Sequence, residues 1–241
     1  VSIDKAGTVS IVVSEAYKKA NGADANPYDQ LDAQNQVAFD EYTKVIGDPA
    51  TTTITVVDNS DEVNTGDYDL SSIDISDMEK YDNVTNGTKS PVVFSAAGKL
   101  LHETEEQYQK QAKLGNATDD YSKMNAHNSG ISVENSYNGS VRASMVYDIP
   151  KNIYYTPNST EKDKNKLKIG DQDWEQNTVT TSDGKTVYVT VYYEVTDITY
   201  KTYGNNTTYT IHEKLTMVTQ NSSKKIEPAD KTNSSGNTNN K

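Results

Sequence analysis

The sequence contains no cysteine, so disulfide bonds, thiolate metal ligands and cysteine nucleophiles are all excluded. Apolar side chains are also scarce: 33% of the 241 residues are hydrophobic, and only 2 are phenylalanine and 1 tryptophan. No run approaches the ~20 apolar residues of a membrane-spanning helix. Basic residues number 23 against 35 acidic ones, which gives a net charge of −12. Nucleic acid is therefore not an expected partner, because its binding requires clustered positive charge.

The apolar shortfall is uneven along the chain. Residues 220 to 241 contain one large apolar side chain, Ile226, and are predicted to form a disordered polar tail. Residues 157 to 173 are rich in Lys, Asp and Asn and are predicted to form a long polar loop. The rest, residues 1 to 219, suits a single domain. The first residues, VSIDKAGTVSIVV, lack the charged and then apolar regions of a signal peptide and resemble a segment of a longer protein.

Two helices are predicted between residues 90 and 137. The first is expected to begin at Ser90-Pro91 and to end near Gly115, with an apolar stripe at four-residue spacing. The second is expected from Asp119 or Asp120 to the stop at Asn138-Gly139, and it contains Gly130. An earlier helical pattern runs from residue 26 to residue 46 and ends at Gly47 and Pro49.

The C-terminal third has the alternating pattern of β-strands. Valines at 187, 189, 191 and 195 alternate with tyrosines and threonines, and a similar alternation runs from residue 207 to residue 219. Asp183-Gly184 and residues 204 to 206 are expected turns, so residues 178 to 219 are predicted to form an antiparallel meander. Residues 9 to 13 and 51 to 57 are further expected strands, and the segment GDYDLSSIDISDME is left as a loop with a short strand. The predicted fold class is α+β.

The first of the two helices contains the pattern H-E-x-x-E. His102 and Glu106 are four residues apart, so their side chains lie on one face of the helix. This is the spacing at which an H-E-x-x-H helix supplies two zinc ligands, with the intervening glutamate as general base. A carboxylate also binds zinc, so the pattern predicts His102 and Glu106 as ligands and Glu103 as base. In the second helix, His127 and Glu134 share a face and are alternative candidates for the third ligand.

Simpler explanations of these residues exist. Acidic helices contain H-E-x-x-E by chance, and Glu106 can pair with Lys110 one turn away. An acidic segment holding Asp74, Asp77, Glu79 and Asp82 could hold calcium, but it lacks the spacing of an EF-hand loop and is better explained as a solvated loop. His212 lies in a predicted strand, where we expect a solvated or cross-strand role.

The succession TTTITVV, IDISDME, SAAGKLLHETEEQYQKQ and AHNSGISVENSYNGSVR resembles C-terminal domains of Rhs/YD-repeat proteins of Bacteroidetes, which are similar to divergent zincin-type metallopeptidases. The match covers about residues 50 to 145. The resemblance implies a helical zincin-like core, with His102, Glu106 and His127 as zinc ligands and Glu103 as base. It also implies Glu134 and Asn135 as second-shell groups or an alternative ligand, although Asn128-Ser129-Gly130 departs from the expected helical sequence.

These observations predict a zinc-dependent, peptidase-like hydrolase that acts on a protein or peptide. The resemblance implies secretion or display at the cell surface, a role as a toxin or effector module, and an immunity protein as partner. One alternative is a non-catalytic extracellular module that binds a partner or glycan through a tyrosine-rich sheet. Its surface would be supplied by Tyr188, Tyr192, Tyr193, Tyr200, Tyr203 and Tyr209. A further alternative is a structural domain of a surface-displayed repeat protein.

Overall fold

The computed structural model describes residues 2–3, 9–11, 14–22, 26–82, 85–86, 94–142, 168–203 and 206–221. The α-helices in these ranges are α1 (Glu15–Asn21), α2 (Ala33–Gly47), α3 (Ile75–Asp82), α4 (Ala96–Tyr108) and α5 (Asp120–Asn138). A 3₁₀ turn, η1 (Pro27–Gln30), precedes α2, and a π-helical turn, η2 (Gln109–Lys113), follows α4. The short strands are β1 (Ser2–Ile3), β2 (Val9–Ser10), β3 (Thr55–Val57), β4 (Gly66–Asp67), β5 (Ser72–Asp74), β6 (Thr85–Asn86) and β7 (Ser140–Arg142). The long strands are β8 (Gln172–Thr181), β9 (Thr186–Tyr203) and β10 (Asn206–Asn221).

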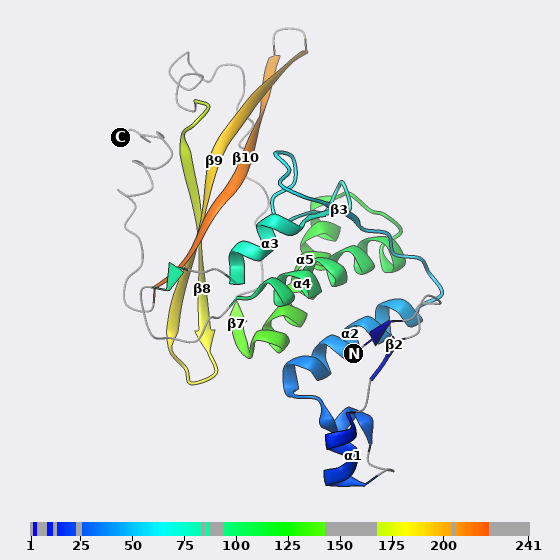
Figure 1. Ribbon diagram of the computed structural model, residues 1–241. Coiled ribbons are helices and arrows are strands. Elements are labelled where there is room, and N and C mark those ends of the chain that lie inside the picture. The colour runs from blue at the N-terminus through cyan, green and yellow to red at the C-terminus, as the bar shows by residue number, and fades with distance from the viewer. Residues whose placement is uncertain are drawn as a thin grey trace.

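The largest sheet has five strands in the order β6-β10-β9-β8-β7. β7 to β10 are mutually antiparallel, and β6 joins β10 in parallel. A smaller sheet has the order β3-β5-β4, and β1 pairs with β2. Helices and an antiparallel sheet occupy separate regions of the molecule, which confirms the predicted α+β class (Figure 1).

The predicted alternation in the C-terminal strands is confirmed. Val187, Val189 and Val191 of β9 are buried on one face, and Gly184 takes a positive φ of 79° in the predicted turn before β9. The apolar cluster on this face consists of Tyr81, Phe94, Val179, Val187, Val189, Val191, Leu215 and Val218. Since Tyr81 belongs to α3 and Phe94 precedes α4, this face of the sheet is the one that packs against the helices.

Helices α4 and α5 lie side by side and run in opposite directions. Gly98 near the start of α4 approaches Asn138 at the end of α5, and Glu106 near the end of α4 contacts His127. Both caps of α5 agree with the sequence prediction: Asp119 accepts a hydrogen bond from the backbone N–H of Ser122, and Gly139 is left-handed.

Two helix boundaries differ from prediction. The helix expected from residue 26 is split, because Leu31 is extended and the Asp32 side chain caps a new helix through the backbone N–H of Asn35. Ser95 caps α4 by accepting from the N–H of Gly98, whereas the start predicted at Ser90-Pro91 lies outside the described residues. The α-helix ends at Tyr108 and continues as η2.

Several other boundaries also shift. The strand expected at residues 51 to 57 is shorter and consists of β3 alone. The segment expected to be a loop with a short strand contains β4, β5 and α3. Of the strand expected at residues 9 to 13, the described part is β2. β8 begins at Gln172, inside the predicted polar loop, and β10 extends to Asn221, beyond the predicted start of the tail. Residues 157 to 167 of the loop and 222 to 241 of the tail lie outside the described residues.

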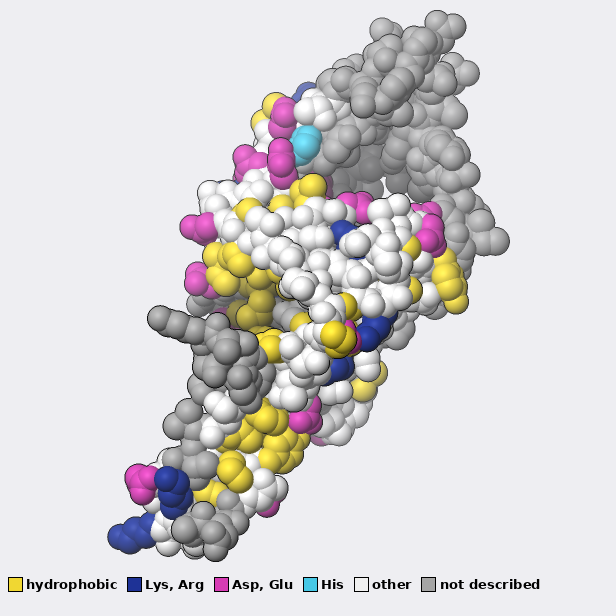
Figure 2. All heavy atoms as spheres, turned by 90° about the vertical axis from the view of Figure 1, so that its right-hand side faces the viewer, with side chains coloured by type: hydrophobic (Ala, Val, Ile, Leu, Met, Phe, Trp, Pro, Cys, Tyr) yellow, Lys and Arg dark blue, Asp and Glu magenta, His cyan; other side chains and the backbone are white. Residues whose placement is uncertain are grey.

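The N-terminal helices are only lightly packed. α1 has no buried residue, and α2 buries only Glu41. Hydrophobic side chains are accordingly visible at the lower end of the face shown in Figure 2, where α1 and α2 lie. Among the described residues, no helix has the length and apolar character that crossing a bilayer requires.

Candidate metal centre

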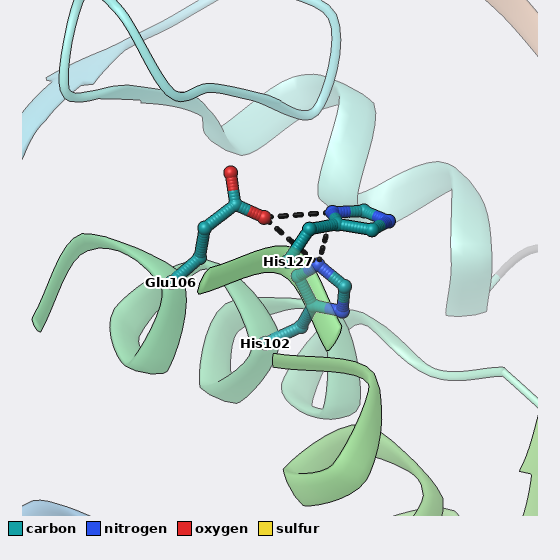
Figure 3. Close-up of side chains that lie close together, drawn as sticks. All are labelled: His102, Glu106 and His127. Atoms are coloured by element: carbon teal, nitrogen blue, oxygen red, sulfur yellow. Dashed lines mark hydrogen bonds and ion pairs between the residues drawn. The ribbon is translucent and has the colours of Figure 1, made fainter. Parts of the chain in front are cut away.

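Three side chains from α4 and α5 converge on one point (Figure 3). Nε2 of His102 lies 3.1 Å from Nδ1 of His127 and 3.3 Å from Oε2 of Glu106. Nδ1 of His127 lies 2.7 Å from the same Glu106 oxygen. His102 and Glu106 are one turn apart on α4, as the H-E-x-x-E spacing requires, and His127 reaches them from α5.

These separations can be compared with those in a zinc site. Two ligand atoms held tetrahedrally at about 2.0 to 2.1 Å from zinc lie about 3.3 to 3.4 Å apart. Two of the separations, 3.1 and 3.3 Å, are close to that value, and the third, 2.7 Å, is shorter and has the length of a hydrogen bond. A set of two imidazoles and one carboxylate leaves a fourth position for water or substrate, which is the composition of catalytic zinc sites.

Glu134 lies on the opposite side of His102 from this point. Its Oε2 accepts a hydrogen bond of 2.9 Å from Nδ1 of His102, so Nε2 is the nitrogen directed toward Glu106 and His127. A carboxylate bonded to the second nitrogen of a ligating histidine fixes the ring and increases its basicity. Of the two candidates for a third ligand, the structure thus brings His127 to the cluster and gives Glu134 the place of an orienting group. Asn135 bonds to the backbone of Arg142 instead.

Glu134 is itself held by two cations. Nζ of Lys99 lies 3.0 Å from Oε1, and a guanidinium nitrogen of Arg142 lies 3.2 Å from Oε2. Glu134 is fully buried, and a buried carboxylate is costly unless it is paired and hydrogen-bonded. Although burial acts to raise it, the pKa of Glu134 is held well below its usual range by Lys99 and His102.

The close approach of α4 and α5 depends on Gly130. A Cβ atom at this position would lie 2.7 Å from the carbonyl oxygen of His102 and 2.8 Å from Cδ2 of its ring. No side chain fits there without moving the helices apart. The glycine that lowers helix propensity within α5 is therefore the residue that allows His102 and His127 to meet.

The electrostatics of the cluster suit a carboxylate ligand. Burial alone would raise the pKa of Glu106, but hydrogen bonds from His102 and His127 outweigh it and lower the pKa to about 2. For His102, burial acts to lower the pKa, and its bonds to Glu106 and Glu134 raise it overall. Burial lowers the pKa of His127. Without metal, hydrogen bonds among His102, Glu106 and His127 hold the cluster together.

Glu103 is buried beside the cluster. Burial raises the pKa of its carboxyl, and although His102 and Lys99 act in the opposite direction, the pKa reaches about 7. Its carboxylate lies directly over Gly66, where a Cβ would come within 2.0 Å of Oε2. A general base works best with a pKa near the working pH. In the metal-free chain the pKa of Glu103 lies in that range.

Two details of the simpler explanations differ from what the structure shows. Lys110 does not pair with Glu106, because its Nζ donates to the carbonyls of Tyr68 and Asp69 and to Ser71. The expected acidic loop is largely helix α3, and its carboxylates bind the chain's own groups. Asp74 accepts from the N–H groups of Asn59 and Ser60, Asp77 pairs with Lys80, and Asp82 accepts from the N–H of Ala96.

The remaining sequence candidates lie on the sheet. His212 contacts Thr199 on the neighbouring strand at 3.2 Å, which is a cross-strand role. The expected tyrosine surface is divided: register places Tyr188 and Tyr192 on one face of β9 and Tyr193 on the other, toward the helices. The side chains of Tyr200, Tyr203 and Tyr209 lie outside the described part of the chain.

A cavity of about 160 Å³ adjoins the cluster, with His102, Glu103 and His127 among its lining residues. The lining also includes Tyr193, which the sequence placed in the alternative tyrosine-rich surface. Other lining residues were not candidates from the sequence: Gly66, Tyr81, Phe94, Lys99, Arg142, Glu175, Asn177 and Val191. The position of Lys99 near the cluster could have been predicted, since it is three residues before His102 on the same helix face. The positions of Glu175 and Asn177 could not have been predicted, because they depend on how the sheet packs against the helices.

Comparison with known proteins gave no match of this chain to a family model, to a curated protein or to a solved structure.

Proposed function

We propose that this chain is a zinc-dependent hydrolase of peptide bonds. The observation that carries the proposal is the convergence of His102 Nε2, Glu106 Oε2 and His127 Nδ1 at tetrahedral spacing, beside a cavity. The orienting bond from His102 to Glu134 supports it, because ligating histidines nearly always have such a partner. The ligand set is also the only kind that a chain without cysteine can offer.

The residues around the cluster have distinct roles in this chemistry. When bound, zinc supplies a Lewis acid that polarises a carbonyl oxygen and makes water more acidic. Glu103, with its pKa near 7, accepts the proton from the attacking water and passes it to the leaving amine. Lys99 and Arg142 line the cavity and both contact Glu134, and their remaining N–H groups are the donors that would favour the oxyanion of the tetrahedral intermediate.

The biological setting of the proposal follows from the sequence resemblance. We propose that the chain is the effector module of an exported or surface-displayed Rhs-type protein, which acts on a protein or peptide outside the producing cell. Such a module requires an immunity protein in the cell that makes it. The support is that His102 and Glu106 of α4 and His127 of α5, to which the resemblance assigned a shared role, meet at one point.

The test is the zinc content of the purified chain after zinc loading and dialysis, measured by elemental analysis. We expect about one zinc per chain in the wild type, because three protein ligands and one open position form a complete site. Glu106→Gln and His127→Ala should each lose most of the zinc, and His212→Ala, which removes the histidine outside the site, should retain it. Glu103→Gln should keep the zinc and lose about 100-fold or more in peptide hydrolysis, the usual effect of removing a general base.

Two results would contradict the proposal. One is a wild-type chain that retains no zinc. The other is full zinc retention in both Glu106→Gln and His127→Ala, which would place the ion elsewhere. Circular dichroism of each variant checks that it folds, and Glu106→Gln is chosen because it preserves the volume of the buried side chain.

A further inference from the structure

The cavity beside the cluster has two walls of different character. One wall belongs to the helices and holds His102, Glu103 and His127. The opposite wall belongs to the main sheet and holds Glu175 and Asn177 of β8 with Val191 and Tyr193 of β9. A substrate bound at the cluster therefore lies against the sheet, and the sheet residues are placed to select it.

Glu175 is a charged residue on the face of the sheet that carries the apolar cluster. Its register partner on β9 is Val191, and Val179, two positions further than Asn177 on the same face of β8, is fully buried. Glu175 is exposed and also lines the cavity, so it lies where the cavity meets solvent. A carboxylate at this position does not contribute to the apolar packing of the face, and it needs another explanation.

The Glu175 carboxylate has no cation of its own. Within the described residues it forms no ion pair, and it accepts one hydrogen bond of 3.1 Å from the side-chain amide of Asn177. The two cations that line the same cavity, Lys99 and Arg142, are bound to Glu134. Among the described residues, Glu175 thus presents to the cavity a carboxylate without a cationic partner, while Lys99 of α4 and Arg142 of β7 line the same cavity.

The space between the walls suits one extended side chain. About 160 Å³ corresponds to about five water molecules at ~30 Å³ each, which is the size of a side chain of five or so heavy atoms. Tyr81, Phe94 and Tyr193 add aromatic surface to the lining, which can cover the methylene groups of a long side chain. A side chain with an apolar stem and a cationic end fits both the aromatic surface and the carboxylate.

We infer that the enzyme selects peptides carrying a basic side chain next to the bond that is cleaved, with the lysine ammonium or arginine guanidinium bound by Glu175 and the stem against Tyr193. This inference rests on the proposed function and extends it to a substrate class. The charged groups of the lining orient the substrate: the carbonyl oxygen faces Lys99 and Arg142, and the cationic end faces Glu175.

The test compares two small probes that differ in one charge. The hydroxamates of N-acetyl-lysine and N-acetyl-norleucine have side chains with the same stem, and only the first ends in an ammonium group. Calorimetry on the zinc-loaded full-length chain should show the lysine compound binding about tenfold more tightly, the ratio given by one charge-assisted hydrogen bond of ordinary strength. In Glu175→Gln the two compounds should bind equally.

Glu194→Gln is the matched control, because Glu194 is an exposed glutamate on the opposite face of the same sheet. It removes the same charge and should leave the tenfold ratio unchanged. Equal binding of both compounds to the wild type, or a lysine preference that survives in Glu175→Gln, would overturn the inference and leave the zinc site intact. Zinc content is measured on the same samples, and a wild type without zinc would overturn the proposed function and this inference with it.

Discussion

Glu41 of α2 is buried against Glu105 of α4, and Lys44 pairs with both carboxylates at 2.7 and 2.6 Å. Burial raises the pKa of Glu41, the contact with Glu105 adds to the effect, and the pKa reaches about 7 in spite of Lys44. In the unfolded chain the pKa of a glutamate is near 4.3. The folded state therefore holds a proton that the unfolded state releases between about pH 4.3 and 7.

This difference predicts how Glu41 affects stability. The stabilising contribution of protonated Glu41 is present below about pH 4.3 and is lost as the pH rises through 7. Glu41→Gln removes the cost of ionising Glu41, so it should gain stability relative to the wild type between pH 5 and pH 8, by about 1 to 3 kcal/mol. Urea unfolding of both proteins at the two pH values measures the change. Glu62→Gln, at an exposed loop position, should show none, and a pH-independent difference for Glu41→Gln would refute this explanation.

Single residues of the site differ in how far the sequence could predict them. The four-residue spacing of His102 and Glu106 puts them on one face of a helix, so predicting the helix was enough to predict that they lie together. The role of Glu134 depends on which nitrogen of His102 faces the cluster, a rotamer that spacing does not determine. Glu175 depends on the pairing register of β8 with β9 and on the packing of the sheet against α4, so no local pattern could reveal it.

The pairing of α4 with α5 is the element on which the site depends, and Gly130 is its most sensitive position. Gly130→Ala gains about 1 kcal/mol of helix propensity. Its Cβ would lie 2.7 Å from the carbonyl oxygen of His102, and overpacking of this kind against backbone costs about 1 to 3 kcal/mol. We expect a net loss of stability and, because His102 and His127 move apart, a zinc affinity at least about tenfold lower, since 1.4 kcal/mol of strain is tenfold.

Zinc titration and urea unfolding test this expectation together. Gly47→Ala is the matched control, since a Cβ at that position meets nothing within 4 Å. It should leave zinc affinity unchanged and should not lower stability, because it adds helix propensity without a steric contact. A Gly130→Ala variant that binds zinc as tightly as the wild type would show that the separation of the helices is not set at this residue.

Elements with strong local signals were predictable, and those formed by distant partners were not. α5 begins at the cap Asp119 and ends at Gly139, both of which are visible in the sequence. α3 was missed because it has only eight residues, too few for a helical period to show. The prediction of one helix from residue 26 was wrong at its start. The apolar spacing suggests a continuous helix, but Leu31 is extended and Asp32 caps a new helix after it.

At the scale of the whole molecule, zinc would tie α4 to α5 and stabilise the folded state. The unfolded chain competes weakly for the ion, because it has no cysteine and 3 histidines. At free zinc 100-fold above its Kd, the gain is about 2.7 kcal/mol. For a chain of this size, that corresponds to a rise of about 5 to 10 °C in Tm. Thermal scans with zinc and with EDTA measure the shift, which should vanish in Glu106→Gln and persist in His212→Ala.

The α+β class was predictable because it requires only that helical and alternating patterns occupy different parts of the chain. The interior was harder to foresee. Helix α4 is buried nearly all round, including Lys99, Glu103, Glu105 and Glu106, where the sequence suggested a single apolar stripe. The low hydrophobic fraction is therefore partly a property of the interior itself, in which ion pairs and hydrogen bonds replace apolar contacts.

The compact arrangement of the site along the chain also bears on how the protein is made. His102, Glu106, His127 and Glu134 belong to two consecutive helices, whereas the sheet wall of the cavity comes from β8 and β9. Contacts between neighbouring segments form faster than distant strand pairings, and the N-terminal part of a chain leaves the ribosome first. On the proposed function, metal capture by the helix pair would therefore precede closure of the cavity, which requires β8 and β9.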